Sequence, residues 1–321
     1  MAKKLGVVTS GGDAPGMNAA VRAVTRTAIA EGLEVIGYQR GYAGLLDAQY
    51  IKLDARAVGG IIHQGGTFLK TSRADRMKTD EGISEASEVL KEHSPDGLIV
   101  IGGDGSFRAA SKISHRSGVP VIGIPATIDN DLAGTETTIG FDTAVNTGVS
   151  AIDKIRDTAT SHERVFIVEV MGRGRGFIAL EVGISTGAEI ILIPEIEYDE
   201  ENVCARLEKS RRSGKRSGII VMAEGAGDCV EVGDFITRRT GFEVRLTRLG
   251  HLQRGGPPTA LSRLLASRMG FSSIKFLLRG ERNIMTALKN GAIIPVDLEY
   301  ACTRKKKIDV SLYELASLLS T

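Results

Sequence analysis

The sequence predicts an α/β protein with mostly parallel β-sheets. Short runs of apolar, β-branched residues alternate along its 321 residues with longer segments of helical periodicity, which is typical of successive β–α units. Glycine is the second indicator, because the 39 glycines are about 12% of the chain against a usual share of about 7%. Their clusters follow the predicted strands. A chain of this length is expected to form roughly two domains.

We expect strands where short apolar, β-branched runs are bounded by turn residues. They lie at residues 5–9, 34–38, 97–101, 120–124, 165–170, 189–193, 218–223 and 243–249. Helical periodicity predicts helices at residues 17–31, 84–92, 107–116, 142–160, 200–213, 259–279 and 311–319. The last of these carries Leu312, Leu315 and Leu319 on one face, which predicts a helix docked on the core by its leucines.

Composition and charge exclude several classes of protein. The 41 basic and 39 acidic residues give a formal net charge of +2, which argues against bulk nucleic-acid binding. Cys204, Cys229 and Cys302 form no CxxC pair, which fits a reducing compartment. The sequence shows no signal peptide and no 18-residue apolar stretch. We therefore expect a cytoplasmic protein with no nucleic-acid or membrane partner.

Three glycine-rich turns directly follow predicted strands, at residues 10–13, 102–106 and 172–176. In an open parallel sheet the ligand lies at the carboxyl ends of the strands. Glycine also lets backbone N–H groups approach phosphate oxygens closely. The turns therefore predict a ligand that carries phosphate.

The turn at 102–106 reads Gly-Gly-Asp-Gly-Ser and precedes a predicted helix. A helix N-terminus attracts anions, and the Asp104 carboxylate is placed to face a bound Mg²⁺. A tight turn in which Asp104 or Ser106 caps the helix is the alternative. The chain contains neither a GxxxxGK[ST] P-loop nor a GxGxxG fingerprint.

A polar segment after the strand at 120–124 carries Thr127, Asp129 and Asp131. One carboxylate could accept a proton from a substrate hydroxyl while the other helps to hold a metal. Asx turns in a surface loop explain the same residues equally well. Taken together with the turn at 102–106, the segment favours phosphoryl transfer.

Arg73, Arg173 and Arg254 lie in loops that also contain glycines. Phosphoryl transfer depends on positioned cations, because negative charge spreads over the phosphate oxygens. Each arginine taken alone is more often a solvated surface residue, but the glycine context favours anion ligands. His251 is either a core histidine or a hydrogen-bond donor to phosphate, and both interpretations stay open.

Residues 9–18, 102–106, 127–131, 170–173 and 250–256 resemble, in order, the bacterial 6-phosphofructokinases. The resemblance extends from about residue 3 to about residue 280. It implies two Rossmann-like α/β domains with the active site in the cleft between them. The nucleotide-binding domain would comprise residues 1–138 plus about 252–301, and the sugar-phosphate-binding domain residues 139–251 plus a C-terminal helix at about 302–321.

The implied activity is transfer of the γ-phosphate of MgATP to the 1-hydroxyl of fructose 6-phosphate. The products are fructose 1,6-bisphosphate and ADP, and the reaction is the committed step of glycolysis. Mg²⁺ is the implied cofactor, and a homotetramer is the usual assembly.

The same resemblance implies roles for individual residues. Asp129 is the general base, Arg73 and Arg173 stabilise transition-state charge, and Thr127 lies beside the transferred phosphate. ATP is bound by Gly12, Arg73, Ala74, Gly103, Asp104, Gly105 and Ser106, and Mg²⁺ by Asp104 and Asp131. Fructose 6-phosphate is bound by Thr127, Ile128, Asp129, Arg164, Met171, Gly172, Arg173, Glu224, Arg245, His251, Leu252, Gln253 and Arg254. Of these, Arg164 and Arg245 match arginines that reach it from a neighbouring subunit.

The phosphoryl donor depends on two positions. Pyrophosphate-dependent relatives usually carry Asp where Gly105 stands and Lys where Ala126 stands. Gly105 leaves space for the inner nucleotide phosphate and Ala126 offers no cation, so both favour ATP, although ATP-dependent members usually have Gly at position 126. The alternatives are a pyrophosphate-dependent 6-phosphofructokinase and a catalytically silent phosphate sensor. The presence of Asp129 and Arg173 counts against the sensor.

Members of this family bind ADP or phosphoenolpyruvate as effectors between subunits. The matching residues are Arg22, Arg26, Arg156, Gly187, Ala188, Glu189, Lys215, Arg216 and Ser217. An interface cluster of ion pairs is the alternative. Ala55 stands where the family usually has an effector-binding arginine, and Ser213 replaces a common lysine. We therefore expect a retained but weakened response to effectors.

Overall fold

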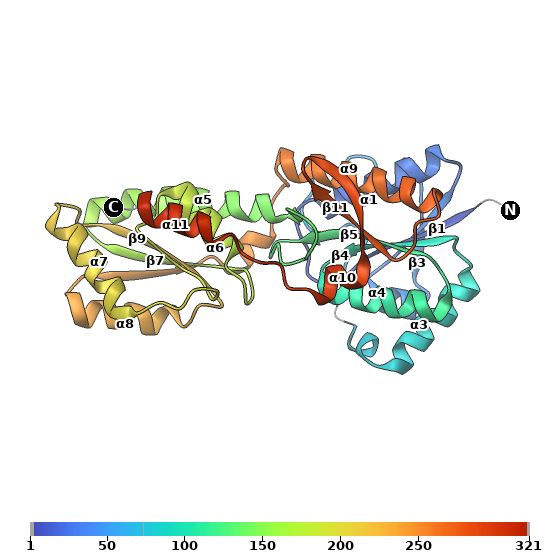
Figure 1. The fold of residues 1–321 in the computed structure, drawn as a ribbon. Coiled ribbons are helices and arrows are strands. Elements are labelled where there is room, and N and C mark those ends of the chain that lie inside the picture. Colours follow the sequence, from blue (N-terminus) through green and yellow to red (C-terminus); the bar gives the residue numbers. More distant parts are fainter. Residues whose placement is uncertain (1–2, 73, 320–321) are drawn as a thin grey trace. The chain divides into compact units, whose positions relative to one another are not determined.

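The computed structural model describes residues 3–72 and 74–319. These residues form two compact units, each discontinuous in sequence (Figure 1). Unit 1 contains the described residues of Met1–Thr127, Asp131–Asp142 and Arg254–Lys306. Unit 2 contains those of Ile128–Asn130, Thr143–Gln253 and Lys307–Thr321.

Unit 1 contains a sheet whose central strands are parallel. Its strands are β1 (Lys4–Thr9), β2 (Glu34–Tyr38), β3 (Tyr50–Leu53), β4 (Gly97–Gly102), β5 (Val121–Thr127), β6 (Ile139–Gly140), β11 (Ile284–Lys289) and β12 (Ala292–Asp297). Their order is β12-β11-β5-β4-β1-β2-β3, with β6 beside β5. The strands from β11 to β2 pair in parallel, whereas β3 and β12 are antiparallel at the two edges.

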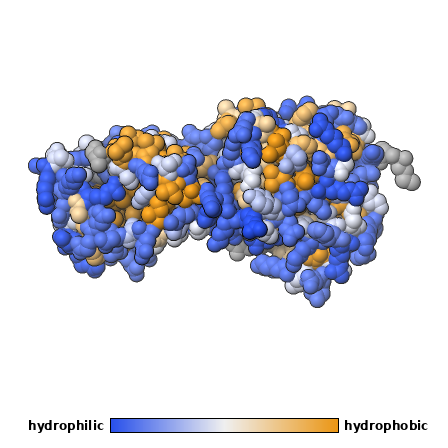
Figure 2. Space-filling view, viewed as in Figure 1, coloured by the Kyte–Doolittle hydropathy of each residue, from blue (hydrophilic) through white to orange (hydrophobic). Residues whose placement is uncertain are grey.

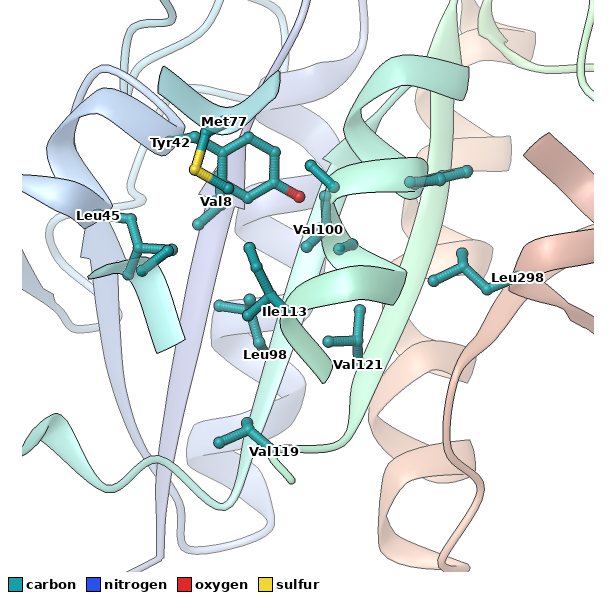
Figure 3. Close-up of a cluster of buried hydrophobic side chains, with 14 of the residues drawn as sticks. Val8, Tyr42, Leu45, Met77, Leu98, Val100, Ile113, Val119, Val121 and Leu298 are labelled. Carbon is teal, nitrogen blue, oxygen red and sulfur yellow. The ribbon is translucent and has the colours of Figure 1, made fainter. Parts of the chain in front are cut away.

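Helices cover both faces of this sheet (Figure 1). They are α1 (Met17–Ala30), α2 (Tyr42–Leu46), α3 (Asp80–His93), α4 (Asp104–Ser117), α9 (Ala260–Leu278) and α10 (Leu298–Thr303), with a 3₁₀ helix at Asp75–Lys78. α1 packs against α9 on one face, and α4 packs against α3 and α10 on the other. The core on the α4 side includes Val8, Tyr42, Leu45, Val100 and Ile113 (Figure 3). The central strands are almost wholly apolar because both of their faces are buried.

Unit 2 contains a smaller sheet in which every described pairing is parallel. Its strands are β7 (Val165–Val170), β8 (Ile190–Leu192), β9 (Gly218–Ala223) and β10 (Val244–Arg248), in the order β10-β7-β9-β8. Its helices are α6 (Phe177–Thr186), α7 (Glu200–Arg212), α8 (Cys229–Thr240), α11 (Val310–Leu319) and most of α5 (Phe141–His162), and a 3₁₀ helix at Gly250–Arg254 ends in unit 1. α7 and α8 close one core with Ile167, Ile220 and Met222. The expectation of an α/β protein with mostly parallel sheets is confirmed in both units.

Most expected elements are present with bounds shifted by a few residues. β2, β7 and β9 have the predicted bounds, and α3 begins at Asp80 rather than residue 84 because the Thr79 side chain accepts a hydrogen bond from the Gly82 N–H and caps the helix. The structure adds the strands β3, β6, β11 and β12 and the helices α2, α6, α8 and α10. None of the described helices has the length and hydropathy of a membrane span.

The predicted core face of the last helix is wrong. α11 buries Ala316, whereas Leu315 is 41% exposed and Leu319 is 67% exposed. The helix lies against α6 and donates from the Tyr313 hydroxyl to the Ile191 carbonyl oxygen at 3.3 Å, so a small residue faces the protein. Figure 2 shows hydrophobic residues gathered on the surface over α11.

Candidate functional site

The glycine-rich turns at residues 10–13 and 102–106, here called the first and second phosphate turns, lie at one end of the sheet of unit 1. β4 pairs in parallel with both β1 and β5, so their carboxyl ends lie side by side. The Ser10 N–H donates to the Ile101 carbonyl oxygen at 3.0 Å, and a Cβ added to Gly102 would lie 2.5 Å from the Ser10 carbonyl oxygen. The first two turns therefore contact each other through backbone atoms at a distance that only glycine allows.

The turn at 102–106 forms the N-terminus of α4. Gly103 is the N-cap residue and supplies no side-chain cap, while the Phe107 N–H donates to the Gly103 carbonyl oxygen at 3.1 Å. The first N–H groups of an α-helix lack intrahelical acceptors and carry partial positive charge. Gly105 lies beside open space, with no atom within 4 Å of an added Cβ. This helix end has the electrostatic properties that bind phosphate.

Asp104 is the first residue of α4 and its side chain is 33% exposed. Arg108 lies one turn further on and forms an ion pair with the Asp104 carboxylate at 3.4 Å, and its Nε donates to the Cys302 carbonyl oxygen at 3.1 Å. Asp131 is half-buried in the same unit. The described residues contain no group of three metal-ligating side chains. One or two carboxylates suit Mg²⁺, which takes its other ligands from substrate phosphates and water, so the residues fit this metal.

Arg254 belongs to unit 1 and lies beside the first phosphate turn. Its Nη1 donates to the Asp13 carbonyl oxygen at 3.3 Å, and a Cβ on Gly12 would lie 2.6 Å from that nitrogen. The structure thus brings a guanidinium group to Gly12, one of the expected nucleotide ligands. Ala74 is half-buried before the 3₁₀ helix, and Arg73 lies outside the described residues.

The turn after β7 in unit 2 is held by Glu224, which follows β9. The Glu224 carboxylate accepts hydrogen bonds from the Gly172 N–H at 3.3 Å and the Arg173 N–H at 2.5 Å. Arg173 has a left-handed backbone conformation with φ of 60°, which costs energy in a residue with a Cβ. The two charge-assisted hydrogen bonds stabilise that conformation.

Gln253 holds the same turn from its other side. Its Oε1 accepts a hydrogen bond from the Met171 N–H at 2.8 Å, and its Nε2 donates to the Ala144 carbonyl oxygen at 3.2 Å. The side chain is fully buried. Its neighbours His251 and Leu252 are exposed, so Gln253 anchors a segment whose other side chains face solvent.

Asp129 follows β5 and is 6% exposed. It lies between the fully buried Ile128 and Asn130, and Asn130 is left-handed with φ of 52°. Thr127 is the last residue of β5, and its carbonyl oxygen accepts a hydrogen bond from the Thr138 hydroxyl at 2.6 Å. A buried carboxylate on a constrained turn meets the positional requirement for a general base.

Arg164 and Arg245 share one carboxylate in unit 2. Glu243 pairs with the Arg164 Nε at 2.9 Å and also with Arg245. The hydrogen bond from Arg164 lowers the pKa of Glu243, which therefore stays ionised. The structure brings these two predicted phosphate ligands together beside a single negative charge.

The predicted effector residues divide between the units. Glu189 has a buried side chain and pairs with the Lys215 Nζ at 2.5 Å and the Arg156 Nη1 at 3.8 Å. Arg156 also donates to the Thr186 carbonyl oxygen at 2.6 Å, next to Gly187, which ends α6. These residues cluster in unit 2 together with buried Ala188. Ser217 is half-buried, Arg216 pairs with Glu163 instead, and Arg22 and Arg26 lie on α1 in unit 1.

Two residues at the phosphate turn were not predicted. The Tyr42 hydroxyl donates to the Ser106 carbonyl oxygen at 2.7 Å, and Arg108 pairs with Asp104. Tyr42 and Ser106 are 64 positions apart in sequence, so no local pattern indicates their contact. Arg108 lies four residues after Asp104, and this i,i+4 spacing of opposite charges is a signal that could have identified it.

Known proteins of one family are similar to this chain over almost its whole length. A family model described as phosphofructokinase matches residues 4–277. The ATP-dependent 6-phosphofructokinase of Halothermothrix orenii is 50% identical over 330 residues, which cover 99% of each chain. The one from Thermotoga neapolitana is 52% identical over 318 residues, 99% of this chain and 100% of that one.

A solved structure agrees with these relatives. The crystal structure of Pichia pastoris phosphofructokinase in the T-state matches with a TM-score of 0.89 and 32% identity. The match covers 99% of this chain and 36% of that chain, so the present protein spans about a third of the length of that enzyme.

Proposed function

Because the chain belongs to the phosphofructokinase family, we propose that it is an ATP-dependent 6-phosphofructokinase. It transfers the γ-phosphate of MgATP to the 1-hydroxyl of fructose 6-phosphate and forms fructose 1,6-bisphosphate and ADP in the cytoplasm. The observation that carries this proposal is the phosphate turn at the start of α4, where Asp104 lies next to the open space at Gly105. An aspartate at position 105 would fill that space with negative charge.

Unit 1 binds the nucleotide in this proposal. Gly12, Arg73, Ala74 and the turn from Gly103 to Ser106 surround ATP, and the N-terminus of α4 faces its phosphates. Asp104, supported by Asp131, would hold Mg²⁺, which would neutralise charge on the phosphates. The Arg108 guanidinium at 3.4 Å holds the Asp104 carboxylate in place.

Asp129 accepts the proton of the 1-hydroxyl as that oxygen attacks the γ-phosphorus. The bond between the γ-phosphorus and the bridging β–γ oxygen breaks, ADP departs, and the proton passes from Asp129 to solvent. Arg73 and Arg173 stabilise the negative charge on the transferred group, and Thr127 lies beside it. The burial of Asp129 limits competition from water for the carboxylate.

Unit 2 binds the sugar phosphate. Met171, Gly172 and Glu224 hold the fructose ring, and the 6-phosphate is bound by His251, by Arg254, and by Arg164 and Arg245 of a neighbouring copy in a homotetramer. The shared Glu243 keeps these two arginines together while no phosphate is bound. Ile128, Leu252 and Gln253 complete the proposed binding segments.

The effector site of the proposed tetramer binds ADP or phosphoenolpyruvate. Glu189, Arg156 and Lys215 supply charge in unit 2, and Arg22, Arg26, Gly187, Ala188, Arg216 and Ser217 complete it. Ala55 and Ser213 supply no cation, which weakens the response. Light scattering should report a tetramer. Steady-state kinetics should show that its cooperativity toward fructose 6-phosphate shifts modestly with either effector. A tetramer that shows no shift with either compound would contradict this part of the proposal.

Product identification tests the proposed reaction itself. The chain is incubated with MgATP and fructose 6-phosphate, and the products are followed by phosphorus NMR. The proposal requires fructose 1,6-bisphosphate and ADP in equal amounts, with no phosphate release in the absence of the sugar. Formation of ADP and inorganic phosphate alone would contradict it.

A further inference from the structure

Tyr42 reaches the phosphate turn from outside the residues assigned to the site. Its hydroxyl donates to the Ser106 carbonyl oxygen at 2.7 Å, and its side chain is 3% exposed. Burial raises the pKa of the Tyr42 phenol above its usual range, so the hydroxyl stays protonated and remains a donor. A buried, fully protonated phenol therefore acts on the first turn of α4.

The hydrogen bond from Tyr42 begins a chain that runs back toward the N-terminus of α4. The Ser106 carbonyl and the Phe107 N–H belong to one peptide group, and the Phe107 N–H donates to the Gly103 carbonyl oxygen at 3.1 Å. The Gly103 carbonyl and the Asp104 N–H belong to the next peptide group in this chain. Linked hydrogen bonds polarise one another, so donation by Tyr42 strengthens the Asp104 N–H as a donor.

The tyrosine itself is held in a fixed position. Its ring packs in the core with Val8 and Met77 (Figure 3). The preceding Gly41 has φ of 67°, and a Cβ added there would lie 2.8 Å from the carbonyl oxygen of Thr9, the last residue of β1. The segment before Tyr42 is therefore pressed against the strand that leads into the first phosphate turn.

We propose that Tyr42 is a positioning residue for the nucleotide phosphates, acting through the Ser106–Phe107 and Gly103–Asp104 peptide groups on the N–H donors at the start of α4. This inference rests on the proposed use of ATP. Tyr42 contacts neither the reacting atoms nor the sugar. Its effect falls on nucleotide affinity rather than on the chemical step.

The Tyr42→Phe variant removes the hydroxyl and keeps the ring. Loss of one buried hydrogen bond is expected to weaken ATP binding by about fivefold. The dissociation constant of MgATP is measured by calorimetry on the full chain without sugar, and kcat and the KM for fructose 6-phosphate are measured separately. The inference predicts weaker ATP binding and a raised KM for ATP, with the other two constants unchanged within about twofold.

Tyr38→Phe is the matched control in the same unit. Tyr38 is also a buried phenol, and its hydroxyl is hydrogen-bonded to the His93 Nδ1 at 3.0 Å, away from the phosphate turn. This variant should lose stability to a similar extent yet bind ATP as the wild type does. Unchanged ATP binding in Tyr42→Phe, or an equal loss in Tyr38→Phe, would overturn the inference. A wild-type chain that binds no ATP would overturn the proposed function and the inference with it.

Discussion

Asp129 is the residue on which the proposed chemistry depends most. It is 6% exposed and precedes a left-handed asparagine, so the position of its carboxylate is set by the backbone on both sides. A buried carboxylate can take a proton from a bound alcohol with little competition from water molecules. Serine at this position keeps a small polar side chain but removes the base.

We expect Asp129→Ser to lower kcat by about 10²- to 10⁴-fold, the range that general-base catalysis typically contributes. The KM for fructose 6-phosphate should change little, because the phosphate ligands remain. Steady-state kinetics with both substrates varied measure the two effects. Asp153→Ser, at an exposed position on α5, is the control and should leave both constants unchanged. Near-normal kcat in Asp129→Ser would remove Asp129 from the role of base.

At the scale of elements, the turn after β7 depends on two side chains that lie far away in sequence, the exposed Glu224 and the buried Gln253. Glu224 binds the N–H groups of Gly172 and Arg173, and Gln253 binds the N–H of Met171. The turn at 172–176 contains three glycines and a left-handed arginine, so its own residues restrict its backbone little. Its geometry is therefore set by the Glu224 side chain, which follows β9, and by the Gln253 side chain of the 3₁₀ helix.

Gln253→Ala should lower the free energy of unfolding by about 2–4 kcal/mol, because the part-buried Met171 N–H and the buried Ala144 carbonyl lose their partner. The KM for fructose 6-phosphate should rise in the same variant, since the turn loosens. Urea unfolding and steady-state kinetics measure the two changes. Gln64→Ala, at an exposed glutamine, is the control for both. A Gln253→Ala chain as stable as the wild type would show that the turn is held by other contacts.

The sequence predicted most strands that form buried apolar runs, and also β10, which is largely exposed. β9 is an apolar run covered on both faces, and β7 is buried except at the half-buried Phe166 and Glu169, so burial and sequence pattern largely coincide. β3 is a largely exposed edge strand and β6 has only two residues, so neither produces a run that stands out. The β11–β12 hairpin turns at Asn290 and Gly291, both with positive φ, and an Asn-Gly pair is a local sequence signal for such a hairpin.

For the whole molecule, the local sequence predicted the glycine-rich turns but not the distant side chains that hydrogen-bond to them. Glycines and acidic residues at strand ends carry a local pattern, and the structure brings the first two turns into contact. Tyr42, Glu224 and Gln253 act across separations of 51 to 82 residues, which no periodicity reveals. The exposed leucines of α11 show the same limit of local sequence. The spacing of the leucines predicts a helix that packs on the protein, but it does not show which face of the helix is buried.

We expect the chain to use ATP because position 105 is a glycine with open space around it. The most direct measurement compares kcat/KM for MgATP and for magnesium pyrophosphate at saturating fructose 6-phosphate, in the wild type and in Gly105→Asp. We expect turnover with ATP only in the wild type. In the variant we expect kcat/KM for ATP to fall at least about tenfold, because the added carboxylate repels the phosphates. Turnover with pyrophosphate and not with ATP in the wild type would show that Gly105 does not select the nucleotide.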